Sequence, residues 1–179
     1  MDFQEFIRRH GEKAYNFAYR LAGNEQDARD LVQEAFARAL EHRERYDESR
    51  RFDAWLNRIL HNVYLDGIRR HANRKTVSLD SPAPAQEAQW DEVLEGADAD
   101  PESLMARREE DAMIQKALDA LPVAYKTALL LCDVEGLPYE RIAEIMACPV
   151  GTVRSRIHQG RVLMRRALEE FEGHGGTLQ

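Results

Sequence analysis

Near the C-terminus, arginine, serine and histidine recur at a spacing that suits contact with DNA. Between Glu144 and Glu169 the chain has no acidic residue and five arginines. In an α-helix, at 100° per residue, Arg154, Ser155 and His158 share one face and the apolar residues share another. Arginine can hold guanine O6 and N7 with two hydrogen bonds, and serine or histidine can contact base edges or phosphates. The segment therefore predicts a helix that packs by one face and reads DNA by the other.

The residues before this helix predict a second, shorter helix and a turn that support it. Apolar residues from Tyr139 to Met146 indicate a short helix, Ala147 and Cys148 form a turn, and Pro149 suits the first position of the next helix. Ala143 is small enough for two helices to cross closely. A helix-turn-helix over residues 137–166 follows, with the N-terminus of its second helix, near Thr152, offering amides to a phosphate.

Three amphipathic helices are predicted before residue 75. The second opens at Asn24, with Asp27 three residues on as a variant capping box. Its apolar stripe is Ala28, Leu31, Val32, Ala35, Phe36, Ala39 and Leu40. The third helix is predicted to bury Phe52, Trp55, Leu56, Ile59, Leu60, Val63 and Ile68. Together they form one small bundle.

The charge of the chain, −7 overall, is unevenly distributed. Residues 76–111 carry 11 acidic and 2 basic side chains, whereas residues 1–75 carry 13 and 15. The proline, alanine and acidic residues after position 75 are typical of a flexible tether, with a short helix near 90–94 as an option. Helix is predicted again over 103–120 and from Pro122, placed at its first position. The sequence thus predicts an all-α protein with domains at 1–75 and 103–172, joined by an acidic linker at 76–102.

Several classes of function are disfavoured. Cys132 and Cys148 have no CxxC spacing or histidine pair, so buried reduced thiols are expected and no metal site. No nucleophile elbow, phosphate-binding glycine loop or paired carboxylates appear, so neither an enzyme nor a cofactor is expected. The absence of a long apolar run or a signal segment predicts a cytoplasmic protein without membrane insertion.

The stretch LPVAYKTALLLCDVEGLPYERIAEIMACPVGTVRSRIHQGRVLMRRAL closely resembles region 4 of bacterial extracytoplasmic-function (ECF) sigma factors, which reads the promoter −35 element. The resemblance implies that 154, 155 and 158 face bases and that 152, 156 and 161 contact the backbone or flanking positions. The implied −35 residues are Thr152, Arg154, Ser155, Arg156, His158 and Arg161.

The N-terminal stretch resembles region 2 of the same family. NEQDARDLVQEAFARAL is similar to the helix that binds core RNA polymerase, and FDAWLNRILHNVYLDGIRR to the helix that reads the −10 element. The implied polymerase-binding residues are Asp27, Asp30, Gln33, Glu34 and Arg38. The implied −10 residues are Tyr46, Arg50, Arg51, Arg58, His61, Asn62, Arg69 and Arg70. The tryptophan at position 55 has the spacing of a core residue rather than of a stacking platform.

This resemblance implies a promoter-specific initiation factor that binds promoter DNA and the β′ clamp helices and β flap of core RNA polymerase. It also implies restraint by an anti-sigma factor, since this is common in the family. A ligand-responsive helix-turn-helix repressor or activator is the alternative, in which residues 1–100 would sense a ligand and dimerise.

Overall fold

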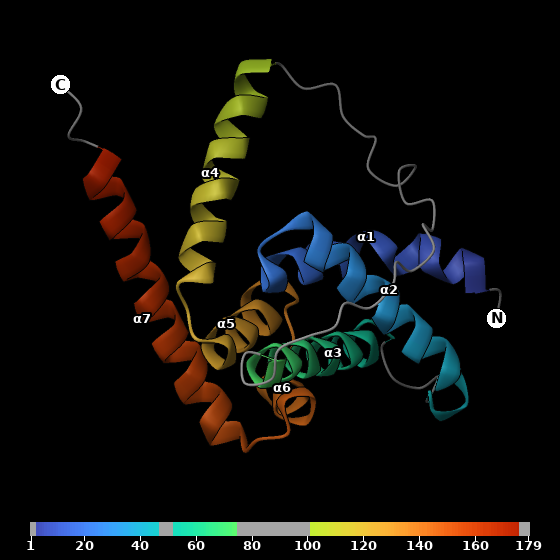
Figure 1. Cartoon of the computed structure of the whole chain (residues 1–179). Helices are drawn as coiled ribbons and strands as arrows, with labels where there is room; N and C mark the ends of the chain where they lie inside the picture. Colours follow the sequence, from blue (N-terminus) through green and yellow to red (C-terminus); the bar gives the residue numbers. More distant parts are fainter. Residues whose placement is uncertain (1–2, 47–51, 75–100, 176–179) are drawn as a thin grey trace.

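The computed structural model describes residues 3–46, 52–74 and 101–175, and within these ranges all regular structure is helical. In chain order the elements are α1 (Phe3–Ala22), α2 (Glu25–Glu41), η1 (Arg43–Arg45), α3 (Phe52–Arg74), α4 (Pro101–Asp119), α5 (Val123–Leu129), η2 (Leu130–Val134), α6 (Tyr139–Met146) and α7 (Val150–Gly175). Helices α1–α3 form an N-terminal domain and α4–α7 a C-terminal domain (Figure 1). The predicted all-α fold is confirmed, while most of the predicted linker and its optional short helix lie outside the described residues.

The N-terminal domain is a three-helix bundle whose core is built from the apolar stripes of α1, α2 and α3. Phe17, Leu21 and Leu60 are each at most 1% exposed. The predicted stripe of α2 is buried except for its last residue, Leu40, which is 40% exposed. Ile68 of α3 is also on the surface, at 37% exposure. The predicted burial of Leu40 and Ile68 was wrong, because the apolar pattern of each helix continues beyond the part of the helix that a neighbour covers.

The N-terminus of α2 is capped as its sequence predicts. The Asn24 side-chain oxygen accepts a hydrogen bond of 2.9 Å from the backbone N–H of Asp27, and the Asn24 amide donates to the Asp27 carboxylate at 2.8 Å. The cap satisfies an N–H group that has no partner within the helix. The helix that carries the implied polymerase-binding residues therefore begins at a fixed point.

Replacing Asn24 by alanine is expected to lower the free energy of unfolding by about 1 kcal/mol, because this N–H loses its partner. Urea titration followed by circular dichroism measures the change. Asn16→Ala is the matched control, since Asn16 is an exposed residue inside α1 and caps nothing. Equal stability of Asn24→Ala and the wild type would contradict the capping role.

The C-terminal domain places two helices around a tight turn. After α5 the chain continues as one π-helical turn, η2, in which the Glu135 N–H donates to the Leu130 carbonyl. Helix α6 then ends at Ala147, whose φ of 49° and ψ of 48° are left-handed. This single residue takes the conformation that glycine often supplies at such turns. Cys148 and Pro149 follow it and α7 begins at Val150, so the predicted helix-turn-helix is present.

Two prolines lie one position earlier than predicted. Pro122 and Pro149 immediately precede α5 and α7 instead of occupying the first helical position. The carbonyl of each accepts hydrogen bonds from the first turn that follows, at 2.9–3.1 Å. Each proline therefore acts as the N-terminal flanking residue of its helix.

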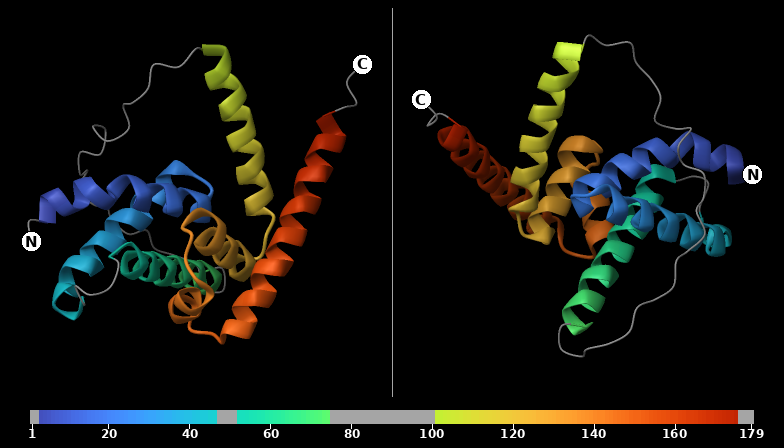
Figure 2. Two further views of the ribbon diagram at one scale, coloured as in Figure 1. Left: turned by 180° about the vertical axis from the view of Figure 1, so that it is seen from behind. Right: turned by 45° about the horizontal axis from the view of Figure 1, so that its top comes forward.

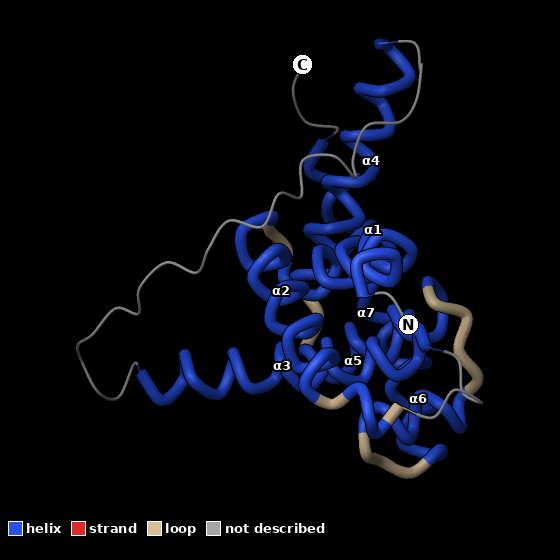
Figure 3. Tube along the Cα trace, turned by 90° about the vertical axis from the view of Figure 1, so that its right-hand side faces the viewer, coloured by secondary structure: helices blue, strands red, loops and turns tan. Residues whose placement is uncertain are grey.

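The two domains pack against each other. Helix α1 contacts α4 and α5, and α3 contacts α6 (Figure 2). Figure 3 shows the short loops that join the helices of the C-terminal domain. The far ends of α4 and α7 diverge from the body of the molecule (Figure 1).

Candidate nucleic-acid interface

One face of α7 is open to solvent and carries side chains suited to DNA. Arg154, Ser155 and His158 are exposed, whereas Val153 and Ile157 are at most 1% exposed. The Ser155 hydroxyl donates to the carbonyl of residue 152 at 3.2 Å. Burial of the apolar face fixes the rotation of the helix, and the polar face is left free to enter a groove.

The other two arginines implied at the −35 element are engaged within the protein. Arg161 holds the Asp133 carboxylate with two hydrogen bonds of 3.1 and 2.6 Å. This pairing holds the pKa of the Asp133 carboxyl below its usual value. Arg156 is half-buried, and its Nη1 lies 3.5 Å from Cys148 Sγ. Thr152 is half-buried in the first turn.

The implied −10 residues on helix α3 of the N-terminal domain differ in their exposure to solvent. Arg58, Asn62, Arg69 and Arg70 are exposed. His61 is instead 4% exposed, and its Nδ1 has no hydrogen-bond partner among the described residues. Arg50 and Arg51 lie outside the described residues.

Tyr46 belongs to an aromatic cluster at the start of α3. Its ring centroid lies 5.3 Å from that of Phe52 and 5.2 Å from that of Trp55, and the rings of Phe52 and Trp55 are 5.3 Å apart. Tilted and edge-to-face contacts at these separations stabilise aromatic clusters. Trp55 is half-buried and packs against the core, in agreement with the role expected for it.

The outer surface of α2 is polar, as predicted for a docking helix. Asp27, Asp30 and Glu34 are exposed, and Gln33 is half-buried. Arg38 is also half-buried and donates to Glu34 at 2.7 Å and to Asp66 of α3 at 3.1 Å. Arg38 therefore joins the two helices in addition to any contact it makes with a partner.

Two contacts between the domains involve α3 and were not predicted from the sequence. Burial, and secondarily the charge of Arg156 from the C-terminal domain, lowers the pKa of His61 to about 4. Four residues before it, Asn57 is 4% exposed and donates to Glu135 of the C-terminal domain at 3.1 Å. His61, an implied −10 residue, therefore lies near Arg156, an implied −35 residue, whereas Asn57 and Glu135 were assigned to neither element.

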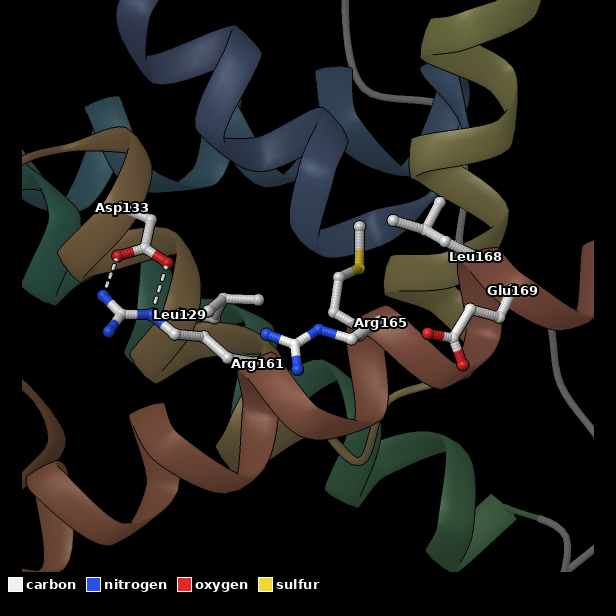
Figure 4. Close-up of a pocket in the computed structure, with 7 residues that line it drawn as sticks. Leu129, Asp133, Arg161, Arg165, Leu168 and Glu169 are labelled. Atoms are coloured by element: carbon white, nitrogen blue, oxygen red, sulfur yellow. Dashed lines mark hydrogen bonds and ion pairs between the residues drawn. The ribbon is translucent and has the colours of Figure 1, made fainter. Parts of the chain in front are cut away.

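An open hollow lies between α5, η2 and α7 of the C-terminal domain. It is lined by Leu129, Asp133, Arg161, Met164, Arg165, Leu168 and Glu169, so an apolar floor from α5 and α7 is rimmed by charges (Figure 4). The paired arginine and aspartate close one end of it.

No group of histidine, cysteine and carboxylate side chains among the described residues is arranged to hold a metal ion. No described helix combines the length and hydropathy needed to cross a bilayer. Both cysteines are free thiols. They are half-buried and pack against the core, whereas full burial was expected.

Comparison with known proteins identifies the family. Residues 6–74 match Sigma-70 region 2, and residues 111–164 match Sigma-70, region 4. The ECF RNA polymerase sigma factor SigW of Bacillus subtilis is 32% identical over 171 residues, which cover 94% of this chain and 90% of SigW. The chain belongs to the ECF sigma factors. The SigE factor of Mycolicibacterium smegmatis is 39% identical over 163 residues, which cover 91% of this chain but only 60% of that longer protein.

Solved structures share the fold. The sigma factor RpoE of Bartonella quintana, in complex with the anti-sigma factor NepR, gives a TM-score of 0.68 at 24% identity and covers 94% of this chain and 97% of its own. CnrH, in complex with the cytosolic domain of CnrY, gives 0.64 at 23% identity, with 94% and 88% covered. Both comparisons support the arrangement of helices described above.

Membership of the family determines the general function of this ECF sigma factor. It directs RNA polymerase to promoters, and sigma factors act as initiation factors and not as enzymes. The alternative of a ligand-responsive repressor is set aside, because residues 6–74 match a sigma region and not a sensing domain.

Proposed function

We propose that the exposed face of α7 reads the −35 element through Arg154, Ser155 and His158. The observation that carries the proposal is the contrast between this face and the buried Val153 and Ile157, which fix it in position. Three polar side chains within five residues match the length over which a recognition helix contacts base edges. Arg156 and Arg161, each held by a neighbour, would supply phosphate contacts at the edge of the groove.

The N-terminal domain would read and open the −10 element. Arg58, Arg69 and Arg70 are exposed cations on α3, and Asn62 offers a donor and an acceptor beside them. A base inside a duplex is hidden, so sequence-specific melting requires a base to leave the stack. Binding of that base and of the single-strand phosphates would offset the free-energy cost of unstacking, so no nucleotide hydrolysis would be needed.

Two further surfaces suit the polymerase. The acidic outer face of α2, with Asp27, Asp30 and Glu34, would dock on the β′ clamp helices, and the hollow floored by Leu129 and Leu168 would receive the β flap (Figure 4). The factor would act in the cytoplasm, with the polymerase. A protein anti-sigma factor is a further proposed partner, since structural relatives were solved with one.

The function is tested by run-off transcription with purified core polymerase and a pool of genomic promoters from the source organism. We expect initiation from a subset of promoters when the factor is added to core. Core with a known sigma factor serves as the positive control. If that control initiates and this factor gives no transcript from any promoter, the proposal fails.

Replacing Arg154 by alanine is expected to weaken −35-dependent initiation by roughly 5- to 150-fold, which corresponds to about 1–3 kcal/mol. The lost group is exposed, so the melting temperature should not change. Arg166→Ala is the matched control, since Arg166 is an exposed arginine on the same helix more than three turns away. Loss of core binding in the Arg154 variant would contradict the role assigned to it.

A further inference from the structure

The guanidinium of Arg161 is held along one edge only. Its Nε and Nη2 donate to the two carboxylate oxygens of Asp133 at 3.1 and 2.6 Å (Figure 4). Nη2 also lies 3.9 Å from Cys132 Sγ. Because the guanidinium is planar, Nη1 points away from this edge, and no described residue accepts a hydrogen bond from it. The Arg161 side chain is 51% exposed, so two N–H groups of a fixed cation are presented to solvent.

The turn that follows α5 places Asp133 for this pairing. In η2 the Glu135 N–H donates to the Leu130 carbonyl five residues earlier at 3.0 Å, instead of the four-residue spacing of an α-helix. Such π-helical turns are rare and occur frequently at functional sites. Leu130 and Leu131 of the same turn are at most 2% exposed. Core packing therefore fixes the backbone from which the carboxylate reaches Arg161.

Arg161 lies on the same stripe of α7 as the proposed base readers. Seven residues separate it from Arg154, so the two side chains lie within about 20° of each other around the helix and about 10 Å apart along it. Recognition helices contact bases through their N-terminal residues, whereas phosphate contacts fix the register of the protein on the duplex. The position of Arg161 therefore suits a phosphate that flanks the bases contacted by Arg154.

We infer that Asp133 is a positioning residue for −35 recognition, which holds the Arg161 guanidinium so that Nη1 meets a DNA phosphate. The inference rests on the proposed role of α7 in reading the −35 element. A long side chain that becomes ordered only on binding lowers affinity by about 2- to 12-fold. The bidentate pair orders Arg161 before DNA arrives, so this loss is avoided.

The charge of Asp133 has an opposing effect on DNA binding. A carboxylate repels phosphates, so on charge alone the removal of Asp133 would tighten binding. Salt screens this repulsion, with a Debye length of about 8 Å at 0.15 M ionic strength, but it does not screen the entropy of ordering a side chain. Positioning and simple repulsion therefore predict opposite signs for the same substitution.

The experiment measures the Kd of preformed holoenzyme for a promoter that the run-off assay identifies, at about 0.15 M and about 0.3 M salt. Asp133→Asn keeps the shape of the side chain but replaces one acceptor oxygen by an NH2 group. We expect the Kd to rise about 2- to 12-fold at both salt concentrations. Asp133→Glu, which retains two acceptor oxygens, should bind more tightly than Asp133→Asn. An unchanged or lower Kd for Asp133→Asn would overturn the inference.

The matched control is Glu144→Gln. It removes the same charge from another arginine pair of this domain, Arg141 and Glu144 at 2.6 Å. This variant should not raise the Kd. A rise equal to that of Asp133→Asn would count against a specific role of Asp133.

A double-substitution cycle distinguishes positioning from a purely structural role. Arg161→Ala should weaken promoter binding by itself, and Asp133→Asn should cause no further loss in that background. Equal losses in both backgrounds would show that Asp133 acts independently of Arg161. Arg161→Lys keeps the charge but lacks the planar fork that a carboxylate holds by two bonds, so it should also bind more weakly than the wild type. Affinity of Arg161→Lys equal to the wild type would contradict the inference.

Arg154→Ala in the same assay tests the proposed function separately. If this variant binds the promoter as the wild type does, the proposed base reader is wrong, while the cycle still decides whether Asp133 acts on DNA through Arg161. Association of Asp133→Asn with core polymerase should be unchanged. Loss of core association without a change in promoter binding by the holoenzyme would assign the pair to the polymerase contact and overturn the inference.

Discussion

Replacing Ile157 by alanine is expected to lower the free energy of unfolding of the C-terminal domain by about 2–5 kcal/mol. The side chain is 1% exposed and lies on the face of α7 that packs against α5 and α6. Truncation leaves a cavity that close-packed neighbours fill only in part. Since marginal stability is typical of small domains, the recognition helix should lose its fixed position and −35-dependent initiation should fall with it. Urea titration and run-off transcription on the same samples measure the two losses.

The control for this variant is Ile114→Ala, which makes the same chemical change at a side chain that is 37% exposed. It should alter stability far less. Arg154→Ala supplies the opposite case, in which initiation falls while stability is retained. A stable Ile157→Ala protein with normal initiation would show that the apolar face does not position the reading face.

Acidification is expected to destabilise the folded form through His61, by about 2 kcal/mol at pH 5 and about 3 kcal/mol at most. Burial, reinforced by the charge of Arg156, lowers the pKa of this histidine to about 4 from the ordinary value of 6.5. The folded form therefore favours neutral imidazole, while the unfolded chain binds a proton more readily. The stability that the folded form gains by holding His61 neutral is fully present above pH 6.5, declines as the pH falls, and is lost below about pH 4.

The measurement is the free energy of unfolding in urea at pH 7.5 and pH 5, for the wild type and for His61→Gln. Carboxylates titrate in both proteins, so only the difference between the two pH dependences reports on His61. We expect the loss of stability on acidification to be about 2 kcal/mol larger in the wild type. His158→Gln, at an exposed histidine of α7, should retain the full dependence of the wild type. Identical pH dependence of His61→Gln and the wild type would exclude a buried neutral His61.

Local patterns predicted the elements of this fold well. The Asn24 cap, the helix-turn-helix and the exposed Arg154 face each follow from interactions between residues a few positions apart. Amphipathic periodicity determines which face of a helix is apolar. It does not determine how far a neighbouring helix extends along that face, which is why Leu40 and Ile68 were assigned to the core although they are exposed.

Contacts between the domains could not be predicted in the same way. His61 was assigned to −10 reading from its neighbours in α3, and only the packing of α6 reveals that it is buried. The bond from Asn57 to Glu135 joins residues 78 positions apart. One signal was available for the bond from Lys126 to the Leu21 carbonyl, since this lysine interrupts an otherwise apolar or small stretch that continues to Cys132. A lysine in such a stretch requires a specific acceptor if it is buried.

The bond between Lys126 and the Leu21 carbonyl joins residues 105 positions apart, and this separation has a consequence for protein synthesis. Domains generally fold as units, the N-terminal one first, while the ribosome adds about 5–20 residues per second. The end of α1 therefore waits roughly 5–20 seconds for the lysine that will cap it. During that interval water solvates its last carbonyls, and α3 has no C-terminal domain to cover it. Each nascent molecule thus exposes Asn57 and His61 of α3 to water until the C-terminal domain is made and covers them.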